Sequence, residues 1–165
     1  KHYAIEYDAN IGVRSDPNKW LIPLPVGDRV IPVGGLICVD MYGVDGEPGI
    51  PWMLQRMGAK LIIHCTNGVR NREPTNGLST ELSDKISNDW HDVVLRRTSF
   101  LTRIPMITVD NCYMHDGTEY HGSTSSESGV LIDGKWVTSV QRADTQYFYY
   151  DFFIDDVAID LPDLS

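Results

Sequence analysis

The stretch that decides the fold runs from residue 29 to residue 40 and reads RVIPVGGLICVD. Its apolar residues are mostly β-branched, which is typical of strands, and the Gly34-Gly35 pair in the middle predicts that two strands are separated there. A second apolar run, residues 60–65 (KLIIHC), follows residues 50–58, in which apolar side chains recur at helical spacing. Strand, helix and strand with short joints indicate a βαβ unit with parallel strands.

The sequence on either side of this unit predicts the other elements of an α/β domain. Residues 1–28 are polar and broken by three prolines, which favours irregular structure with short extended pieces. Residues 87–103 predict a long helix that Ser87 or Asn88 caps. Further strands are predicted at 105–109, 130–132, 136–140 and 146–154, with a hairpin turn at Asp133-Gly134. This order predicts a layered α/β arrangement with helices on one face of each sheet.

Composition and charge exclude several classes of protein. The chain has 165 residues, 42% hydrophobic and 22% charged, which fits one globular domain rather than two. A net charge of -9 argues against a nucleic-acid partner, because phosphate binding requires clustered Lys and Arg. No apolar stretch approaches the length of a membrane span. The three cysteines fit neither a disulfide framework nor a metal-ligand spacing, so we expect no metal and a reducing cytoplasmic location.

Cys38 is the residue with the clearest chemical potential. It lies near the end of a predicted buried strand, before a Gly-rich loop, and ligands bind at this edge of an α/β sheet. A thiol at a sharp bend between strand and loop can attack a carbonyl carbon, and the backbone N–H groups that follow can bind the oxyanion. The alternative is an inert buried cysteine, since free Cys is among the most buried residue types.

The sequence around Cys38 resembles the nitrilase/amidase family of carbon–nitrogen hydrolases. The resemblance rests on residues 35–40 (GLICVD) and, after them, residues 52–63 (WMLQRMGAKLII), in which a helix ends in Gly-Ala before an apolar strand. It continues through residues 90–97, 105–111 and 122–137, in the order and spacing of the family's long helix, next core strand and hairpin. It implies a nitrilase-type α-β-β-α sandwich, of which residues 1–165 would form the C-terminal portion of a single domain.

The resemblance also implies a chemistry. Cys38 would attack an amide carbonyl or a nitrile carbon and form a thioester-type intermediate, without a cofactor. Lys1 would be the lysine that stabilises the oxyanion together with the backbone N–H of Val39, and Glu6 would be the second glutamate of the site. The family's general-base glutamate would lie upstream of Lys1. A glutamate base suits the chemistry because the thiolate is the nucleophile.

The resemblance further implies substrate contacts and partners. Tyr42 would replace an aromatic residue that the family places after its cysteine, and Thr66 and Asn67 would line the pocket at the same sheet edge. His64 and Cys65 are expected to be satisfied core residues. The partners implied are a small amide or nitrile and either further copies of the chain or a companion N-terminal chain. A non-catalytic fragment that keeps the fold for binding or assembly is the alternative to an enzyme.

Overall fold

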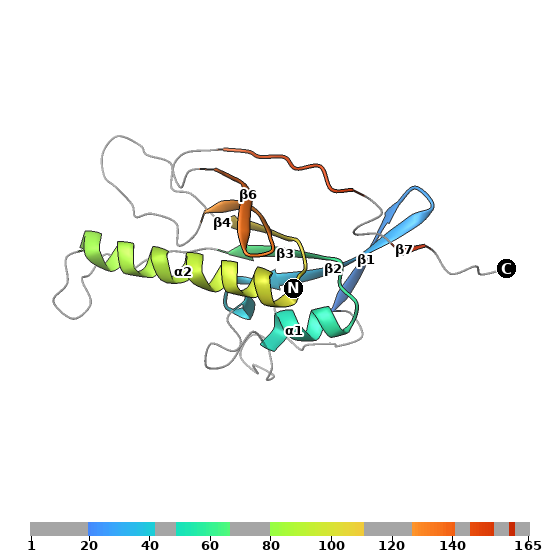
Figure 1. Ribbon diagram of the computed structural model, residues 1–165, viewed down its shortest axis with the longest axis horizontal. Coiled ribbons are helices and arrows are strands. Elements are labelled where there is room, and N and C mark those ends of the chain that lie inside the picture. Colours follow the sequence, from blue (N-terminus) through green and yellow to red (C-terminus); the bar gives the residue numbers. More distant parts are fainter. Residues whose placement is uncertain are drawn as a thin grey trace, which may run out of the picture.

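The computed structural model describes residues 20–41, 49–66, 80–110, 127–140, 146–153 and 159–160. Within these ranges seven strands form one mixed sheet in the order β1-β2-β3-β4-β5-β6, with β7 beside β2. The strands are β1 (Leu21–Val26), β2 (Arg29–Ile37), β3 (Leu61–Thr66), β4 (Met106–Asp110), β5 (Ser128–Ile132), β6 (Lys135–Val140) and β7 (Ile159–Asp160). The helices are α1 (Gly49–Arg56), α2 (Thr80–Thr102) and a 3₁₀ helix, η2 (Cys38–Met41). Figure 1 shows α1 and α2 on the same face of the sheet.

The centre of the sheet is parallel, as the sequence predicts. β2 pairs with β3 and β3 pairs with β4, both in parallel, and Leu36, His64 and Thr108 lie side by side across the three strands. α1 connects β2 to β3, so these elements form the expected βαβ unit. Every second residue of these strands faces the helices. Leu36, Ile62 and Met106 therefore share a buried cluster with Leu54 of α1 and Leu95 of α2.

The prediction of two strands separated at Gly34-Gly35 is wrong, because β2 runs unbroken from Arg29 to Ile37. The reason is the close approach of α1. A β-carbon on Gly34 would lie 2.7 Å from Leu54 Cδ1, so the absent side chain leaves room for the leucine. At this position glycine allows a helix to pack closely and does not end the strand.

Before residue 29 the sequence predicts irregular structure with short extended pieces; the described residues there form one such piece, the six-residue strand β1, and are more regular than predicted because β1 forms a hairpin with β2. Gly27, with a φ of 65°, occupies the first position of the two-residue turn, as a type II′ turn requires. Val26 and Arg29 flank the turn as the first hydrogen-bonded pair. Pro23 and Pro25 therefore fall at the alternate positions, whose nitrogens point away from β2. No hydrogen bond of the hairpin is lost to them.

The two helices differ in how well the sequence predicts their ends. α1 stops where expected, because the N–H groups of Gly58 and Ala59 bond to the carbonyls of Gln55 and Leu54, both at 2.9 Å, in a Schellman motif. α2 begins at Thr80, so Ser87 and Asn88 lie inside the helix and do not cap it. Apolar residues at Leu82, Ile86 and Trp90 continue the helical spacing toward the N-terminus, although they are about half exposed. Of the helices in the described residues, none combines the length and hydrophobicity needed to cross a membrane.

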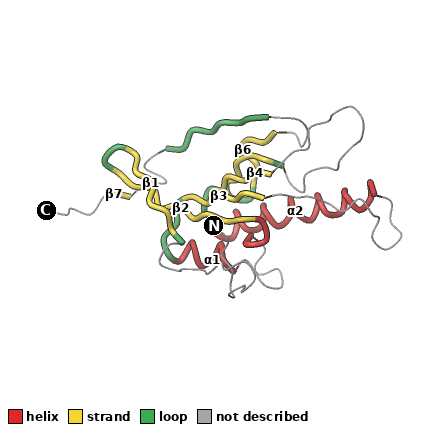
Figure 2. The backbone as a smooth tube through the Cα atoms, turned by 180° about the vertical axis from the view of Figure 1, so that it is seen from behind, coloured by secondary structure: helices red, strands yellow, loops and turns green. Residues whose placement is uncertain are grey.

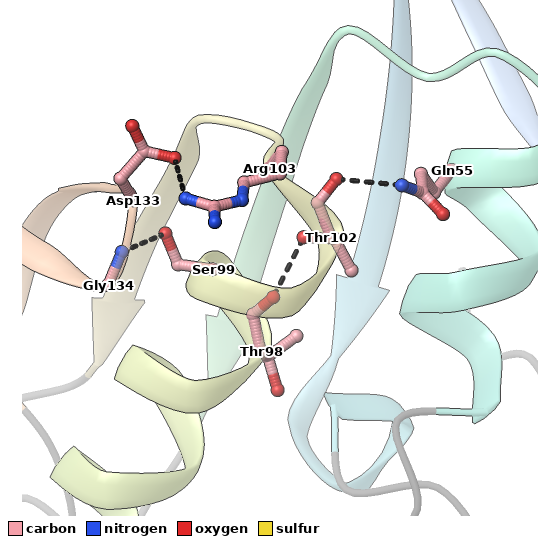
Figure 3. Close-up of polar contacts among 7 residues, drawn as sticks. All are labelled: Gln55, Thr98, Ser99, Thr102, Arg103, Asp133 and Gly134. Carbon is pink, nitrogen blue, oxygen red and sulfur yellow. Dashed lines mark hydrogen bonds and ion pairs between the residues drawn. The ribbon is translucent and has the colours of Figure 1, made fainter.

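The C-terminal turn of α2 is fixed to both of its neighbours (Figure 3). Gln55 Nε2 of α1 donates to the Thr102 carbonyl at 3.0 Å. On the other side, the predicted Asp133-Gly134 turn between β5 and β6 is confirmed. Its Gly134 N–H donates to Ser99 Oγ at 3.2 Å, and Arg103 pairs with Asp133 at 3.0 Å. These contacts hold α2 across the sheet, from α1 to the last hairpin.

The aromatic segment at residues 146–153 is described but is not a strand, contrary to the prediction. Figure 2 shows it as an extended loop on the side of the sheet away from the helices. Phe152 packs there against a second apolar cluster that contains Ile31, Val33 and Leu61. Tyr147, Tyr149 and Phe153 are at least 80% exposed. The segment thus contacts the sheet through few of its rings and makes no ladder of backbone hydrogen bonds with it.

Candidate functional site

Three of the parallel strands end at one edge of the sheet with residues that can carry chemistry. β2 ends at Ile37, directly before Cys38, while β3 ends at Thr66 and β4 at Asp110. Thr66 and Asp110 are partners in the β3–β4 register. Ligands of open α/β sheets bind outside the carboxyl ends of the strands, and this is such an edge. The sequence prediction that Cys38 and Thr66 share an edge is consistent with this arrangement.

Cys38 occupies a sharp left-handed turn. Its φ is 51°, a value that residues with a β-carbon adopt only at a cost. The residue is partly exposed. The chain then enters η2, and the buried carboxylate of Asp40 accepts a hydrogen bond from the Ile37 N–H at 3.0 Å. A carboxylate that reaches back to the residue before a helix is one half of a capping box, and here it closes the turn around Cys38.

His64 closes the same turn from the neighbouring strand. Its Nε2 lies 3.1 Å from the Cys38 carbonyl oxygen, and its Nδ1 lies 2.9 Å from Thr108 Oγ1. His64 is 1% exposed and Thr108 is fully buried. The sequence prediction of a satisfied core histidine is therefore confirmed. The link that it makes from β4 to the residue after β2 was not predicted.

The pKa of His64 lies below its ordinary value of 6.5, first of all because burial penalises the charged ring. The hydrogen bond to the Cys38 carbonyl opposes the shift, as do the negative charges of Asp110 and Asp40. The folded chain therefore holds this ring in its neutral form under conditions in which an exposed histidine would gain a proton.

Acidification below pH 6.5 should accordingly destabilise the folded chain through His64. In that range the unfolded chain binds a proton at this residue and the folded chain does not, so the free energy of unfolding falls with pH by up to about 1.4 kcal/mol per unit. The stabilisation is complete above the ordinary pKa and is lost on descending toward the lowered one. Urea unfolding of the parent and of His64→Gln over this range measures it, and equal pH slopes for the two proteins would contradict the assignment.

The remaining predicted site residues are only partly placed. Lys1, Glu6, Tyr42 and Asn67 lie outside the described residues. Val39 lies in η2, directly after Cys38. Cys65 was expected in the core and is instead exposed, because it follows the core-facing His64 and so points to the opposite face of the sheet. Sequence reasoning did not select Asp40, Thr108 or Asp110 as site residues, although all three stand within motifs that it noted.

A cavity of about 430 Å³ lies on the face away from the helices. Sheet residues such as Ile107, Val109 and Val130 form one wall, and the aromatic segment at residues 146–152 forms the other. Asp110 lines its end, but Cys38 does not line it. Among the residues that the structure describes, no group of three His, Cys, Asp or Glu side chains could hold a metal ion.

Comparisons with solved structures identify the fold. The carbon–nitrogen hydrolase from Helicobacter pylori G27 superposes with a TM-score of 0.55 at 15% identity, over 87% of this chain and 48% of that chain. Two variants of the amidase from Nesterenkonia sp. AN1 match with TM-scores of 0.54 and 0.53, at 14% and 13% identity. These matches cover 99% and 98% of this chain, and 49% and 50% of those chains. No family model and no curated protein sequence matches the chain.

The chain thus spans about half the length of the solved structures that it matches. In one of the two amidase variants the acetamide moiety of fluoroacetamide is added covalently at the active-site cysteine, and in the other acrylamide is added there. Identities this low show the fold alone. The chain has a nitrilase-type α/β fold, which is incomplete when set beside these structures.

Proposed function

We propose that this chain, which has the fold of the carbon–nitrogen hydrolases over about half of their length, hydrolyses a small non-peptide amide with Cys38 as nucleophile. The observation that carries the proposal is the position of Cys38. The residue is partly exposed, lies in a left-handed turn at the carboxyl end of β2, and is held there by Asp40 and His64. Sharp turns between a strand and a helix are how several hydrolase folds present a nucleophile.

The reaction that we propose has two halves. Cys38 Sγ bonds to the amide carbonyl carbon, the oxygen takes the π electron pair, and collapse of this intermediate breaks the C–N bond. The nitrogen takes a proton and leaves as ammonia or an amine. Water then adds to the thioester, the C–S bond breaks, and a carboxylic acid leaves with the thiol restored. The sum is amide plus water giving acid plus ammonia.

Roles for other residues are part of the proposal and rest on the family resemblance. The Val39 backbone N–H and Lys1 stabilise the oxyanion, Glu6 is the second glutamate, and a further glutamate is the general base that accepts the thiol proton. We place that base outside residues 1–165, so a companion chain or a longer protein would supply it. Tyr42 and Asn67 contact the substrate together with Thr66, which the structure places at the end of β3.

Self-association and a reducing cytoplasmic location are also part of the proposal. Self-association of the chain is proposed because the family assembles in this way. A reducing cytoplasmic location is proposed because Cys38 must stay a free thiol to react.

The experiment that tests the proposal is ammonia release from a panel of small amides, carbamoyl compounds and nitriles, measured on the protein as it occurs, together with the companion chain or the longer protein that supplies the base. It is paired with mass spectrometry of the chain after incubation with fluoroacetamide. We expect release from amides above nitriles and an acetamide adduct on Cys38. Cys65 is the internal control because it is exposed and lies on the adjacent strand. Fluoride is a poor leaving group, so simple exposure should not suffice for reaction.

If ammonia is released from nitriles alone, the proposed reaction is nitrile hydrolysis and not amide hydrolysis. If no compound releases ammonia and fluoroacetamide shows no preference for Cys38 over Cys65, the proposal that the protein is an enzyme is wrong. A non-catalytic chain that keeps the fold for binding or assembly would then be favoured.

A further inference from the structure

The buried ring of His64 joins three strands at one point. It lies on β3, contacts Thr108 of β4 through Nδ1, and contacts the Cys38 carbonyl at the end of β2 through Nε2. Both contacts are short enough to be hydrogen bonds, at 2.9 and 3.1 Å. The ring is therefore the side chain that connects the interior of the sheet to the residue that we propose as nucleophile.

The chemistry of the two partners fixes the tautomer. A carbonyl oxygen only accepts hydrogen bonds, so Nε2 must carry a hydrogen and donate it to Cys38. A neutral ring then has no hydrogen on Nδ1, which accepts one from the Thr108 hydroxyl. The burial of His64, which lowers its pKa, favours this neutral form. One chain of hydrogen bonds thus runs from Thr108 through the ring to the Cys38 carbonyl.

The turn at Cys38 needs such support. A residue with a β-carbon at a φ of 51° is strained, and strained residues persist only where the surroundings hold them. Asp40 holds the N–H of Ile37, on the amino side of the turn. His64 holds the carbonyl of Cys38, on the carboxyl side. The contact with His64 fixes the peptide group that Cys38 shares with Val39, and with it the direction of the Val39 N–H, while the contact with Asp40 holds the strand end before the turn.

We infer that His64 is a positioning residue, which donates Nε2–H to the Cys38 carbonyl and so fixes the left-handed turn that aims the thiol and the following N–H at the substrate. The inference rests on the proposed function of Cys38 and adds to it a residue on the neighbouring strand. His64 has no part in bond making, because it contacts the backbone of Cys38 and its proton is committed to that carbonyl.

Three variants separate positioning from packing. His64→Gln places its amide N–H near the former Nε2, so it keeps the bond to Cys38 and loses that to Thr108. Thr108→Val also keeps the hydrogen bond from His64 to the Cys38 carbonyl and loses the one between His64 and residue 108. His64→Asn is shorter and reaches only toward Thr108. Each variant removes one buried hydrogen bond, which costs roughly similar stability. Only His64→Asn releases the Cys38 carbonyl.

The experiment measures the rate of fluoroacetamide addition at Cys38 in the full chain, with iodoacetamide as a probe of simple access and urea unfolding as a measure of stability. We expect His64→Asn to slow fluoroacetamide addition by about 10- to 100-fold, and His64→Gln and Thr108→Val to stay near the parent rate. Loss in all three variants in proportion to their stability would overturn the positioning role and leave the proposed function intact.

A second measurement keeps the two proposals apart. If the parent releases no ammonia and its Cys38 reacts with fluoroacetamide no better than Cys65, the proposed function fails, and the carbonyl ¹³C resonance of Cys38 then decides on His64. A shift in His64→Asn that is absent in His64→Gln supports the hydrogen bond and the held turn. An unchanged resonance in His64→Asn overturns them.

Discussion

Replacing Cys38 by glycine is expected to abolish ammonia release while leaving the folded chain at least as stable as the parent. Loss of the thiol removes the nucleophile, which in a hydrolase lowers kcat by a factor on the order of 10⁶. Cysteine at a φ of 51° bears a cost of about 1–2 kcal/mol that glycine does not bear. Glycine loses about 0.5–1 kcal/mol through its greater freedom in the unfolded chain, so the free energy of unfolding should stay equal or rise slightly.

Cys38→Ala is the companion variant. Alanine keeps the β-carbon and with it the strain of the left-handed turn, so it should be as inactive as the glycine variant but no more stable than the parent. Cys65→Ala, on the adjacent strand, is the matched control and should keep its turnover. Ammonia release and urea unfolding measure both effects. Ammonia release by either Cys38 variant would show that Cys38 is not the nucleophile. A lower free energy of unfolding for the glycine variant than for the alanine variant would show that the turn is not strained.

Gly129→Ala is expected to be the most destabilising of the glycine substitutions in the sheet. A β-carbon there would lie 2.2 Å from the Thr138 carbonyl oxygen and 2.8 Å from Ser139 Cα, both of them backbone atoms of β6. Backbone cannot rotate aside as a side chain can, so β5 and β6 must separate next to the register shift at Val130/Leu131. We expect a loss of about 3 kcal/mol, at the top of the usual range for overpacking.

Gly35→Ala is the control for this substitution. Gly35 also lies in the sheet, but a β-carbon there meets nothing nearer than Ile22 Cδ1 at 3.8 Å, which is an ordinary contact. Its effect should stay within about 0.5 kcal/mol. Urea unfolding followed by circular dichroism compares the two variants. Equal midpoints would show that β5 and β6 are not paired as described.

The sequence predicts the parallel strands β3 and β4 well, because they are apolar runs with clear ends. It also predicts the turn at Asp133-Gly134 and the end of α1, where local chemistry decides the backbone. The prediction fails where an element distant in the sequence determines the local structure. Gly34 reads as a break until α1 packs against it, and the prolines of β1 read as irregular structure until the hairpin register places them.

The candidate site was predicted in the same uneven way. Cys38 can be selected from the sequence because the residues next to it carry the resemblance to the nitrilase/amidase family. The contact of His64 with Cys38 spans 26 positions and that with Thr108 spans 44, so only the register of three strands brings them together. The start of α2 at Thr80 was missed because Ser87 and Asn88 look like caps. Their surroundings continue the apolar spacing instead.

The outward prolines of β1 have a consequence for how this chain meets other chains. β1 ends the strand order of the sheet, and exposed apolar side chains (Ile22, Leu24 and Val26) lie along it. Of the strands that the structure describes, β1 is the outermost on its side, and a strand of that composition at the edge of a sheet invites another extended segment to add to it and begin aggregation. Pro23 and Pro25 have no N–H to offer such a segment, and theirs are two of the three β1 nitrogens that point outward, that of Leu21 being the third. The residues that obscure this strand in the sequence are thus the ones that protect the chain from growth at its edge.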